Sequence, residues 1–134
     1  MSEGLRLAVI GAAGKMGRAI IRAVVESGLT LAGAAERAGH EALGADAGEL
    51  AGLGRLGVPV RADLGEALAG AEALIDFAPG ATIASMEAAA ARRLPAVVGT
   101  TSLGDAERAA VAAAAARVPV VLAPNMSVGM NVLF

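Results

Sequence analysis

A glycine-spaced turn near the start of the chain carries the clearest chemical pattern. The turn reads Gly11-Ala12-Ala13-Gly14-Lys15-Met16-Gly17, follows the apolar run Leu5–Ile10 and opens a stretch with helical periodicity. A strand, a glycine turn and a helix in this order can bind the pyrophosphate of a dinucleotide at the helix N-terminus. The glycines are spaced more widely than in the common G-x-G-x-x-G pattern, so the turn alone is a weak indication.

Each glycine of this turn has its own expected role. Gly11 permits the tight turn, Gly14 lets the backbone approach a pyrophosphate, and Gly17 lets the helix pack close to the strand. Lys15, in the first helical turn, is expected either near the pyrophosphate as a point charge or in solvent. The alternative for the whole turn is a glycine-lined connection between strand and helix that binds no ligand.

An acid–base pair, Glu36-Arg37, follows the second apolar strand. Glu36 lies about 20 residues beyond the glycine turn, where an acid that binds ribose is expected. A carboxylate there accepts hydrogen bonds from both adenosine-ribose hydroxyls and favours NADH, whereas Arg37 can pair with a 2′-phosphate and favours NADPH. The pair therefore predicts that either cofactor is accepted; the alternative is a solvated acid–base pair at a strand end.

Three later strands each end in polar residues or glycine. The carboxyl ends of strands in a parallel sheet share one edge, where ligands bind. Gly99 is expected to allow close approach of the cofactor, and Thr101 and Asn125 to hydrogen-bond a carboxamide or a substrate carboxylate. Ordinary turns are the alternative for each. The three segments are Ile75-Asp76-Phe77-Ala78-Pro79, Gly99-Thr100-Thr101 and Ala123-Pro124-Asn125-Met126-Ser127.

Apolar runs alternate with helical patterns along the whole chain, which predicts an α/β fold, a Rossmann-like doubly wound parallel sheet in a single domain. Strands are expected at Leu5–Ile10, Leu29–Ala35, Ala73–Phe77, Ala96–Val98 and Val118–Ala123. Helices are expected at Lys15–Ser27, Leu64–Ala69, Ala81–Arg93 and Asp105–Arg117. Gly28 suits a helix C-cap and Asp63 an N-cap.

The segment Arg37–Val58 interrupts this alternation, because it is polar and rich in glycine. It is interpreted as a long functional or mobile loop with room for a short helical turn, and Val58-Pro59-Val60 as a possible short strand after it. His40 lies in this segment, and an exposed loop histidine is the preferred interpretation.

Composition excludes several classes of function. A length of 134 residues suggests one domain, and a net charge of −2 shows no electrostatic footprint for nucleic acid or an anionic membrane. The chain has no cysteine and one histidine, so disulfides, thiolate metal sites and a zinc cluster are not expected, and a reducing cytoplasm fits. In an enzyme, a cofactor or a further domain must supply the difficult step.

Taken together, these motifs resemble the 4-hydroxy-tetrahydrodipicolinate reductases, also called dihydrodipicolinate reductases. The resemblance extends over essentially the whole chain, in order and at matching spacing. It includes the glycine turn, Glu36-Arg37, Asp46-Ala47-Gly48-Glu49-Leu50 and the three strand ends. The closing A-x-N-x-S-x-G-x-N stretch, Ala123–Asn131, is its most specific part.

The resemblance implies a cytoplasmic reductase of diaminopimelate and lysine biosynthesis, usually a homotetramer. NADH or NADPH would deliver hydride to a cyclic dicarboxylate and give tetrahydrodipicolinate. By motif, Gly11 to Met16 would bind the pyrophosphate, Glu36 the ribose and Arg37 a 2′-phosphate. Gly99 to Thr101 and Ala123 to Met126 would flank the nicotinamide, and Thr101 would also touch the substrate carboxylate.

The chain departs from the family pattern in three places. Ala78 stands where the family often has Ser or Thr, which removes one expected hydrogen bond to the cofactor, and Ser102 replaces a common glycine. The family's second domain, with a His-rich motif, a catalytic Lys and a substrate loop, has no counterpart here. We therefore expect a dinucleotide-binding domain over 1–127, the start of a crossover into a catalytic domain at 128–134, and cofactor binding without turnover.

Two other interpretations stay open at this point. One is a stand-alone dinucleotide-binding module that senses redox state or serves as a subunit. The other is a different dehydrogenase, because malate dehydrogenases also carry a G-A-A-G-x-x-G turn; the Glu36-Arg37 pair and the Asn125–Asn131 motif argue against it. Coding sequence beyond Phe134 would separate the module from the reductase.

Overall fold

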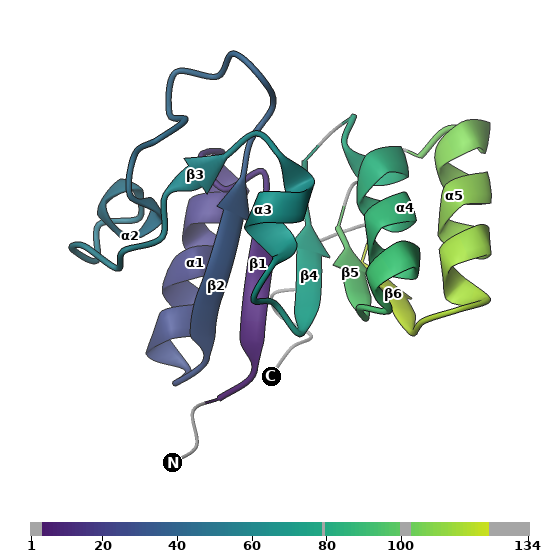
Figure 1. Cartoon of the computed structure of the whole chain (residues 1–134), viewed down its shortest axis with the longest axis horizontal. Coiled ribbons are helices and arrows are strands. Elements are labelled where there is room, and N and C mark those ends of the chain that lie inside the picture. Colours follow the sequence, from purple (N-terminus) through teal and green to yellow (C-terminus); the bar gives the residue numbers. More distant parts are fainter. Residues whose placement is uncertain (1–3, 79, 100–102, 124–134) are drawn as a thin grey trace.

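The computed structural model describes residues 4–78, 80–99 and 103–123 of the chain. Six parallel strands form one sheet in the order β3-β2-β1-β4-β5-β6 (Figure 1). This order reverses direction beside β1, as in doubly wound dinucleotide-binding folds, and confirms the predicted class. The strands are β1 (Arg6–Ile10), β2 (Thr30–Ala35), β3 (Val60–Arg61), β4 (Ala73–Asp76), β5 (Ala96–Val98) and β6 (Val120–Leu122).

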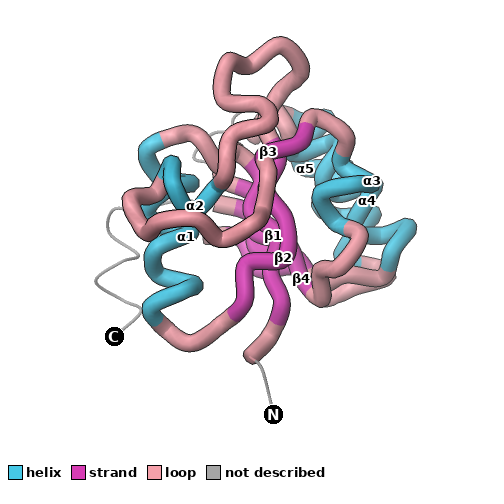
Figure 2. Tube along the Cα trace, turned by 60° about the vertical axis from the view of Figure 1, so that its left-hand side comes forward, coloured by secondary structure: helices cyan, strands magenta, loops and turns pink. Residues whose placement is uncertain are grey.

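Helices cover both faces of the sheet, with α1 and α2 on one side and α3, α4 and α5 on the other (Figure 2). Their bounds are α1 (Lys15–Glu26), α2 (Ala47–Leu50), α3 (Leu64–Leu68), α4 (Thr82–Arg92) and α5 (Asp105–Ala115). Each helix and strand predicted with full bounds is present within two residues of its expected ends. Such shifts are normal, because helix ends fray.

The predicted caps at two helix ends are present. Gly28, at φ +83°, follows the Ser27 cap of α1, and its N–H bonds Val25 O while the Leu29 N–H bonds Val24 O. These two bonds form a Schellman motif, which satisfies the last carbonyls of the helix. At the start of α3, the Asp63 side chain accepts from the Glu66 N–H at 3.0 Å.

The glycine-rich segment between β2 and β3 is organised around one carboxylate. Asp46 Oδ1 accepts from the N–H groups of Gly57 (2.7 Å) and Val58 (3.0 Å), and its Oδ2 accepts from those of Leu56 (2.9 Å) and Glu49 (3.1 Å). One side chain thus replaces the backbone pairing that a longer strand would supply. These bonds, led by that from Leu56, hold the pKa of Asp46 at about 2.

This segment also pairs with the edge of the sheet. The Gly44 N–H bonds Val60 O, and the Val60 N–H bonds Ala45 O, both at 2.9 Å. Arg22 of α1 donates to Ala51 O at 3.2 Å from the other side. The segment therefore holds the predicted short helical turn, as α2, and is tied to both β3 and α1; the short strand expected at 58–60 begins at Val60.

No helix in the described part of the chain has the length and hydropathy to span a bilayer. Residues 124–134 lie outside the described residues, so the predicted domain boundary after residue 127 stays a prediction.

Candidate cofactor site

A cavity of about 660 Å³ lies at the carboxyl ends of β1, β2 and β4. The order of the strands reverses between β1 and β4, and the crevice outside such a point is where ligands bind in open α/β sheets. The volume is within the range of small-molecule and cofactor sites. Its lining brings together the glycine turn, Glu36, Arg37 and the start of α4.

The glycine turn has the geometry expected for two of its three glycines. Gly11 has φ +86°, a left-handed conformation that other residues rarely adopt. A Cβ on Gly17 would lie only 2.0 Å from Gly11 O, so α1 can start this close to the turn only with glycine there. A Cβ on Gly14 would meet no protein atom closer than 3.5 Å, so nothing in the described protein requires glycine at that position.

The N-terminus of α1 is left open toward the cavity. Its N-cap is Gly14, no side chain caps it, and its first turn contains no acidic residue. The N–H groups of Lys15, Met16 and Gly17 find no acceptor among the described residues, and all three residues line the cavity. Free amides and the positive end of a 12-residue helix make an anion-binding site.

The two residues between Gly11 and Gly14 differ from the rest of the glycine turn in their position relative to the cavity. Ala12 is fully buried, and its N–H bonds Ala35 O at 3.1 Å. The Ala13 N–H donates to Glu36 Oε2 at 3.0 Å. Neither alanine belongs to the cavity lining in the described structure. Their part in the predicted site is therefore indirect: they fix the turn and connect it to the end of β2.

Glu36 links the two sides of the site. Its Oε2 holds the glycine turn through the Ala13 N–H, and its Oε1 accepts from the Arg37 N–H at 3.2 Å. An ionised carboxylate offers about four lone-pair positions, so these two bonds leave room for two hydroxyl donors. Glu36 lines the cavity and can therefore hold the turn and a ribose at the same time.

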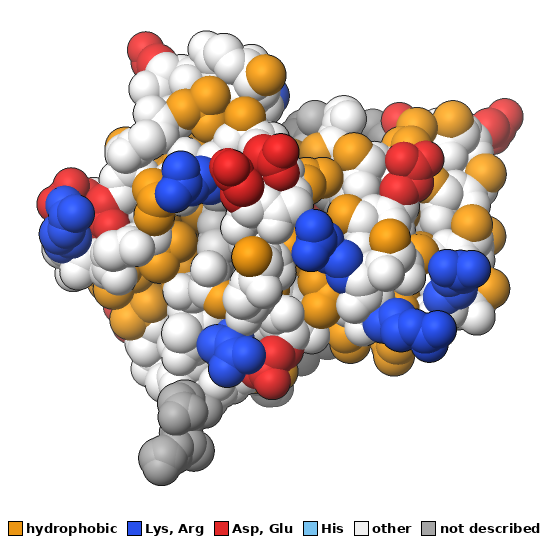
Figure 3. Space-filling view, viewed as in Figure 1, with side chains coloured by type: hydrophobic (Ala, Val, Ile, Leu, Met, Phe, Trp, Pro, Cys, Tyr) orange, Lys and Arg blue, Asp and Glu red, His pale blue; other side chains and the backbone are white. Residues whose placement is uncertain are grey.

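Two flexible cations border the cavity. Lys15 and Arg37 are both exposed, both line the cavity, and neither side chain bonds a described residue. Lys15 is beside the open helix terminus, where a cation near a pyrophosphate is expected. Arg37 is beside Glu36, where a cation near a 2′-phosphate is expected. On the face shown in Figure 3, charges of both signs are dispersed and form no continuous basic patch.

His40 is a cavity residue that sequence reasoning missed. It is partly buried and lines the cavity together with Glu36 and Arg37, so its interpretation as an exposed loop histidine is wrong. The His40 N–H bonds Arg37 O at 3.1 Å across the turn through Gly39 and returns the chain to the cavity.

Gly99 packs directly against an aromatic ring. A Cβ on this residue would lie 1.9 to 2.3 Å from three ring atoms of Phe77, and Gly99 does not line the cavity. The space beside this glycine is filled by the Phe77 ring, which itself lines the cavity. In the described structure Gly99 therefore makes room for Phe77, and its predicted close approach to a cofactor stays a prediction.

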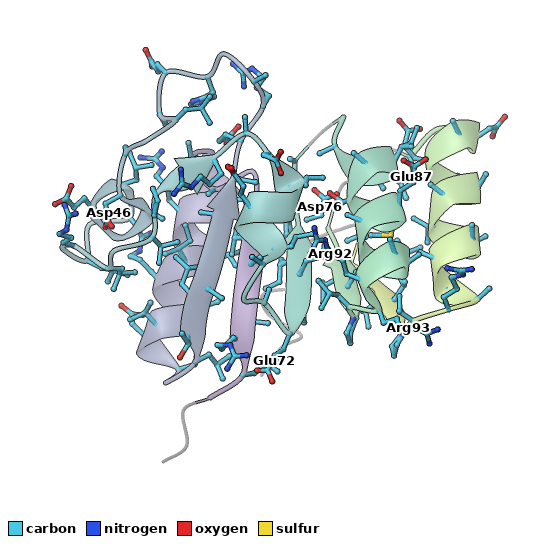
Figure 4. The ribbon with its side chains drawn as sticks, in the orientation of Figure 1. Asp46, Glu72, Asp76, Glu87, Arg92 and Arg93 are labelled. Atoms are coloured by element: carbon cyan, nitrogen blue, oxygen red, sulfur yellow. The ribbon has the colours of Figure 1, made fainter. Side chains whose placement is uncertain are left out.

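Asp76 is a buried carboxyl group at the end of β4, beside α4 (Figure 4). Its Oδ1 accepts from the Ala78 N–H at 2.9 Å, while Oδ2 and the nearby Ser85 Oγ are buried without a well-formed hydrogen bond to described residues. Burial raises the pKa of Asp76, and the Ala78 N–H and the hydroxyls of Ser85 and Thr82 oppose the rise. Asp76 is outside the cavity lining. Its hydrogen bond with the Ala78 N–H holds the start of the β4–α4 connection.

Several predicted site residues lie outside the described residues: Thr100, Thr101, Pro124, Asn125 and Met126. Of their neighbours, Ala123 is described, and its N–H bonds Val98 O at 2.7 Å, which continues the pairing of β6 with β5. Ala123 does not line the cavity. The predicted nicotinamide-flanking and substrate contacts therefore stay predictions.

Comparison with known proteins agrees with this geometry. The family model described as "Dihydrodipicolinate reductase, N-terminus" matches residues 5–126. A 4-hydroxy-tetrahydrodipicolinate reductase of Alkalilimnicola ehrlichii is 52% identical over 128 residues, which are 94% of this chain and 48% of the relative. That of Geobacter metallireducens is 48% identical over 131 residues, or 97% and 49%. The chain thus spans about half the length of the curated relatives it matches.

A solved structure is also similar. Dihydrodipicolinate reductase from Paenisporosarcina sp. TG-14, with dipicolinate bound, matches with a TM-score of 0.68 and 20% sequence identity, over 94% of this chain and 49% of the other. At this identity the match supports the fold. The chain belongs to the family of dihydrodipicolinate reductase N-terminal domains, a family whose cofactor is NADH or NADPH.

Proposed function

We propose that the cavity at the carboxyl ends of β1, β2 and β4 binds NADH or NADPH in an extended conformation. The observation that carries this proposal is the uncapped N-terminus of α1, whose free amides of Lys15, Met16 and Gly17 open on the cavity. The pyrophosphate would accept hydrogen bonds from these amides. Gly14 would let it approach, because no protein atom occupies the space beside that residue.

The adenosine end would lie beside the end of β2. Glu36 would accept hydrogen bonds from the ribose hydroxyls of NADH, and the exposed Arg37 guanidinium would pair with the 2′-phosphate of NADPH. The nicotinamide end would extend toward β4 and β5. We propose as its neighbours, following the family motifs, Gly99, Thr100, Thr101, Ala123, Pro124, Asn125 and Met126, with Thr101 also touching the substrate.

The wider reaction is proposed from the relatives. When bound, the cofactor supplies hydride, and the reductase reaction converts 4-hydroxy-tetrahydrodipicolinate into tetrahydrodipicolinate in diaminopimelate and lysine biosynthesis. This chain's residues would bind and orient the cofactor, and an additional domain, entered near residue 128, would bind most of the substrate. A homotetramer in the cytoplasm is part of the same proposal.

Cofactor binding is tested by titrating the 134-residue chain with NADH and following nicotinamide fluorescence. We expect saturable binding that Glu36→Ala weakens about tenfold or more, since two hydrogen bonds to a charged group are lost. Glu41→Ala, an exposed acid outside the cavity lining, is the matched control. No binding by the folded wild-type chain would overturn the proposal.

The reductase part needs a separate experiment. A chimera that joins this chain, at residue 127, to the C-terminal half of the Alkalilimnicola ehrlichii relative is assayed for oxidation of NADH or NADPH with 4-hydroxy-tetrahydrodipicolinate. We expect turnover by the chimera and none by the 134-residue chain. A soluble, cofactor-binding chimera without turnover would favour a binding module instead.

A further inference from the structure

The loop after β2 carries a second polar side chain whose position the cofactor assignment does not use. His40 is four residues beyond Glu36 and shares the cavity lining with it, with Arg37, Ala62 and Leu64. Sequence motifs assign it no role.

Two hydrogen bonds fix the histidine itself. The His40 N–H donates to Arg37 O at 3.1 Å, which closes the turn through Gly39. The Ala42 N–H donates to the ring Nδ1 at 2.9 Å. Because Nδ1 accepts a hydrogen bond, the proton of the neutral ring is on Nε2, which makes no hydrogen bond to another described residue. The ring therefore offers one N–H donor.

The surrounding loop keeps this donor in place. The Leu43 N–H bonds His40 O at 3.2 Å, and the next residues are held to β3 through the Gly44 N–H and Val60 O. Further along, Asp46 ties four amides together. An ordered donor binds a ligand at a lower cost in conformational entropy than a free loop side chain would.

The chemistry of the lining restricts the class of ligand that can bind at this end of the cavity. At this end of the cavity Glu36 is the acid, Arg37 the cation and His40 the additional donor, all on one connection. Glu36 is suited to hydroxyl donors and has no attraction for an anion, whereas Arg37 and His40 both donate. A phosphate with several acceptor oxygens can use both donors simultaneously.

We infer that His40 is a specificity-determining residue, which donates its Nε2–H to the 2′-phosphate of NADPH beside Arg37. This inference rests on the proposed function, because it assumes a dinucleotide in the cavity. It divides the adenosine end into a ribose site at Glu36, used by both cofactors, and a 2′-phosphate site at Arg37 and His40, used by NADPH alone.

The test uses two small probes that differ by one phosphate, 5′-AMP and 2′,5′-ADP, together with NADH and NADPH. In the 134-residue chain, His40→Ala should weaken 2′,5′-ADP and NADPH about tenfold and change 5′-AMP and NADH less than about twofold. His40→Gln, which retains an N–H donor, should recover part of the loss. Arg55→Ala, which removes an exposed cation of the same segment outside the lining, should leave all four affinities within about twofold.

The outcomes separate this inference from the proposed function. Equal losses for both probes would place His40 against the adenine or shared ribose and overturn the 2′-phosphate role, as would no change for either. Failure of the wild-type chain to bind NADH or NADPH would instead overturn the cofactor function itself. Thermal melting of each variant separates a lost contact from a lost fold.

Discussion

The two sides of the candidate site are held in place by different physical means. The glycine turn at residues 11–17 depends on the absence of side-chain atoms, because a Cβ on Gly17 would overlap Gly11 O. The connection from Glu36 to Val58 depends on two carboxylates, Glu36 and Asp46, which accept hydrogen bonds from backbone amides. The first side is therefore sensitive to added volume at Gly17. The second depends on the charge of its carboxylates.

The largest expected effect is steric. Gly17→Ala should lower the free energy of unfolding by about 2–4 kcal/mol, because the new methyl group would lie 2.0 Å from a backbone oxygen and the start of α1 must move. Urea denaturation measures the loss. The matched variant Gly14→Ala should cost under about 1 kcal/mol, because its Cβ has 3.5 Å of clearance, yet weaken NADH binding about tenfold. Similar stability for both variants would contradict the steric account.

The second-largest effect is expected in the connection that Asp46 holds together. Asp46→Asn replaces an acceptor of four amides by a group that brings its own donors, so the connection around α2 should open locally. Hydrogen exchange should show protection at the Leu56, Gly57 and Val58 amides falling by about tenfold or more, with little change in α1. Asp105→Asn, at an exposed acid of α5, is the control. Unchanged protection would mean that the glycine-rich segment does not depend on Asp46.

The pH dependence follows from the same carboxylate. Hydrogen bonds lower the pKa of folded Asp46 from 3.8 to about 2, so its contribution to stability is complete above about pH 4 and is lost as the pH falls toward 2. Protection of the Leu56–Val58 amides should decrease over this range in the wild-type chain, whereas the decrease should be absent in Asp46→Asn. Equal acid sensitivity of the two proteins would assign the transition to other groups.

The smallest effect distinguishes two buried aspartates of opposite character. Burial raises the pKa of Asp76, so its contribution favours the folded state at low pH and is lost as the pH rises. Asp76→Asn mimics the neutral acid and can still accept from the Ala78 N–H. The free energy of unfolding at neutral pH should therefore change little or increase slightly, unlike the response to Asp46→Asn. Strong destabilisation would show that Asp76 is needed as an anion.

The repeated alternation of strands and helices was predictable because its causes are local. Continuous apolar runs, helical periodicity and caps such as Asp63 and Gly28 act over a few residues, and the structure places them within two residues of expectation. The segment between β2 and β3 was less predictable. Asp46 bonds residues up to twelve positions away, and no periodic pattern reveals such contacts.

Residue types and spacing correctly indicated that Gly11, Gly17, Glu36 and Arg37 meet at one cavity, because a strand–turn–helix unit and the end of the next strand lie at the same edge of a parallel sheet. They did not reveal that the Phe77 ring fills the space beside Gly99, and they were misleading about His40, which a glycine turn brings back to the cavity. The Phe77 contact is between segments whose relative placement depends on packing, whereas the turn to His40 is local and is closed by the bond from the His40 N–H to Arg37 O.

The sequence by itself thus determined the fold class, the family and the candidate residues for phosphate and ribose binding, because these follow from short-range backbone geometry and side-chain chemistry. The tertiary structure decided which groups meet at the site: that the Ala13 amide bonds Glu36, that Phe77 packs against Gly99, and that His40 lines the cavity together with Phe77. Such pairings depend on how the strand ends and their connections pack in three dimensions, which no spacing along the chain specifies.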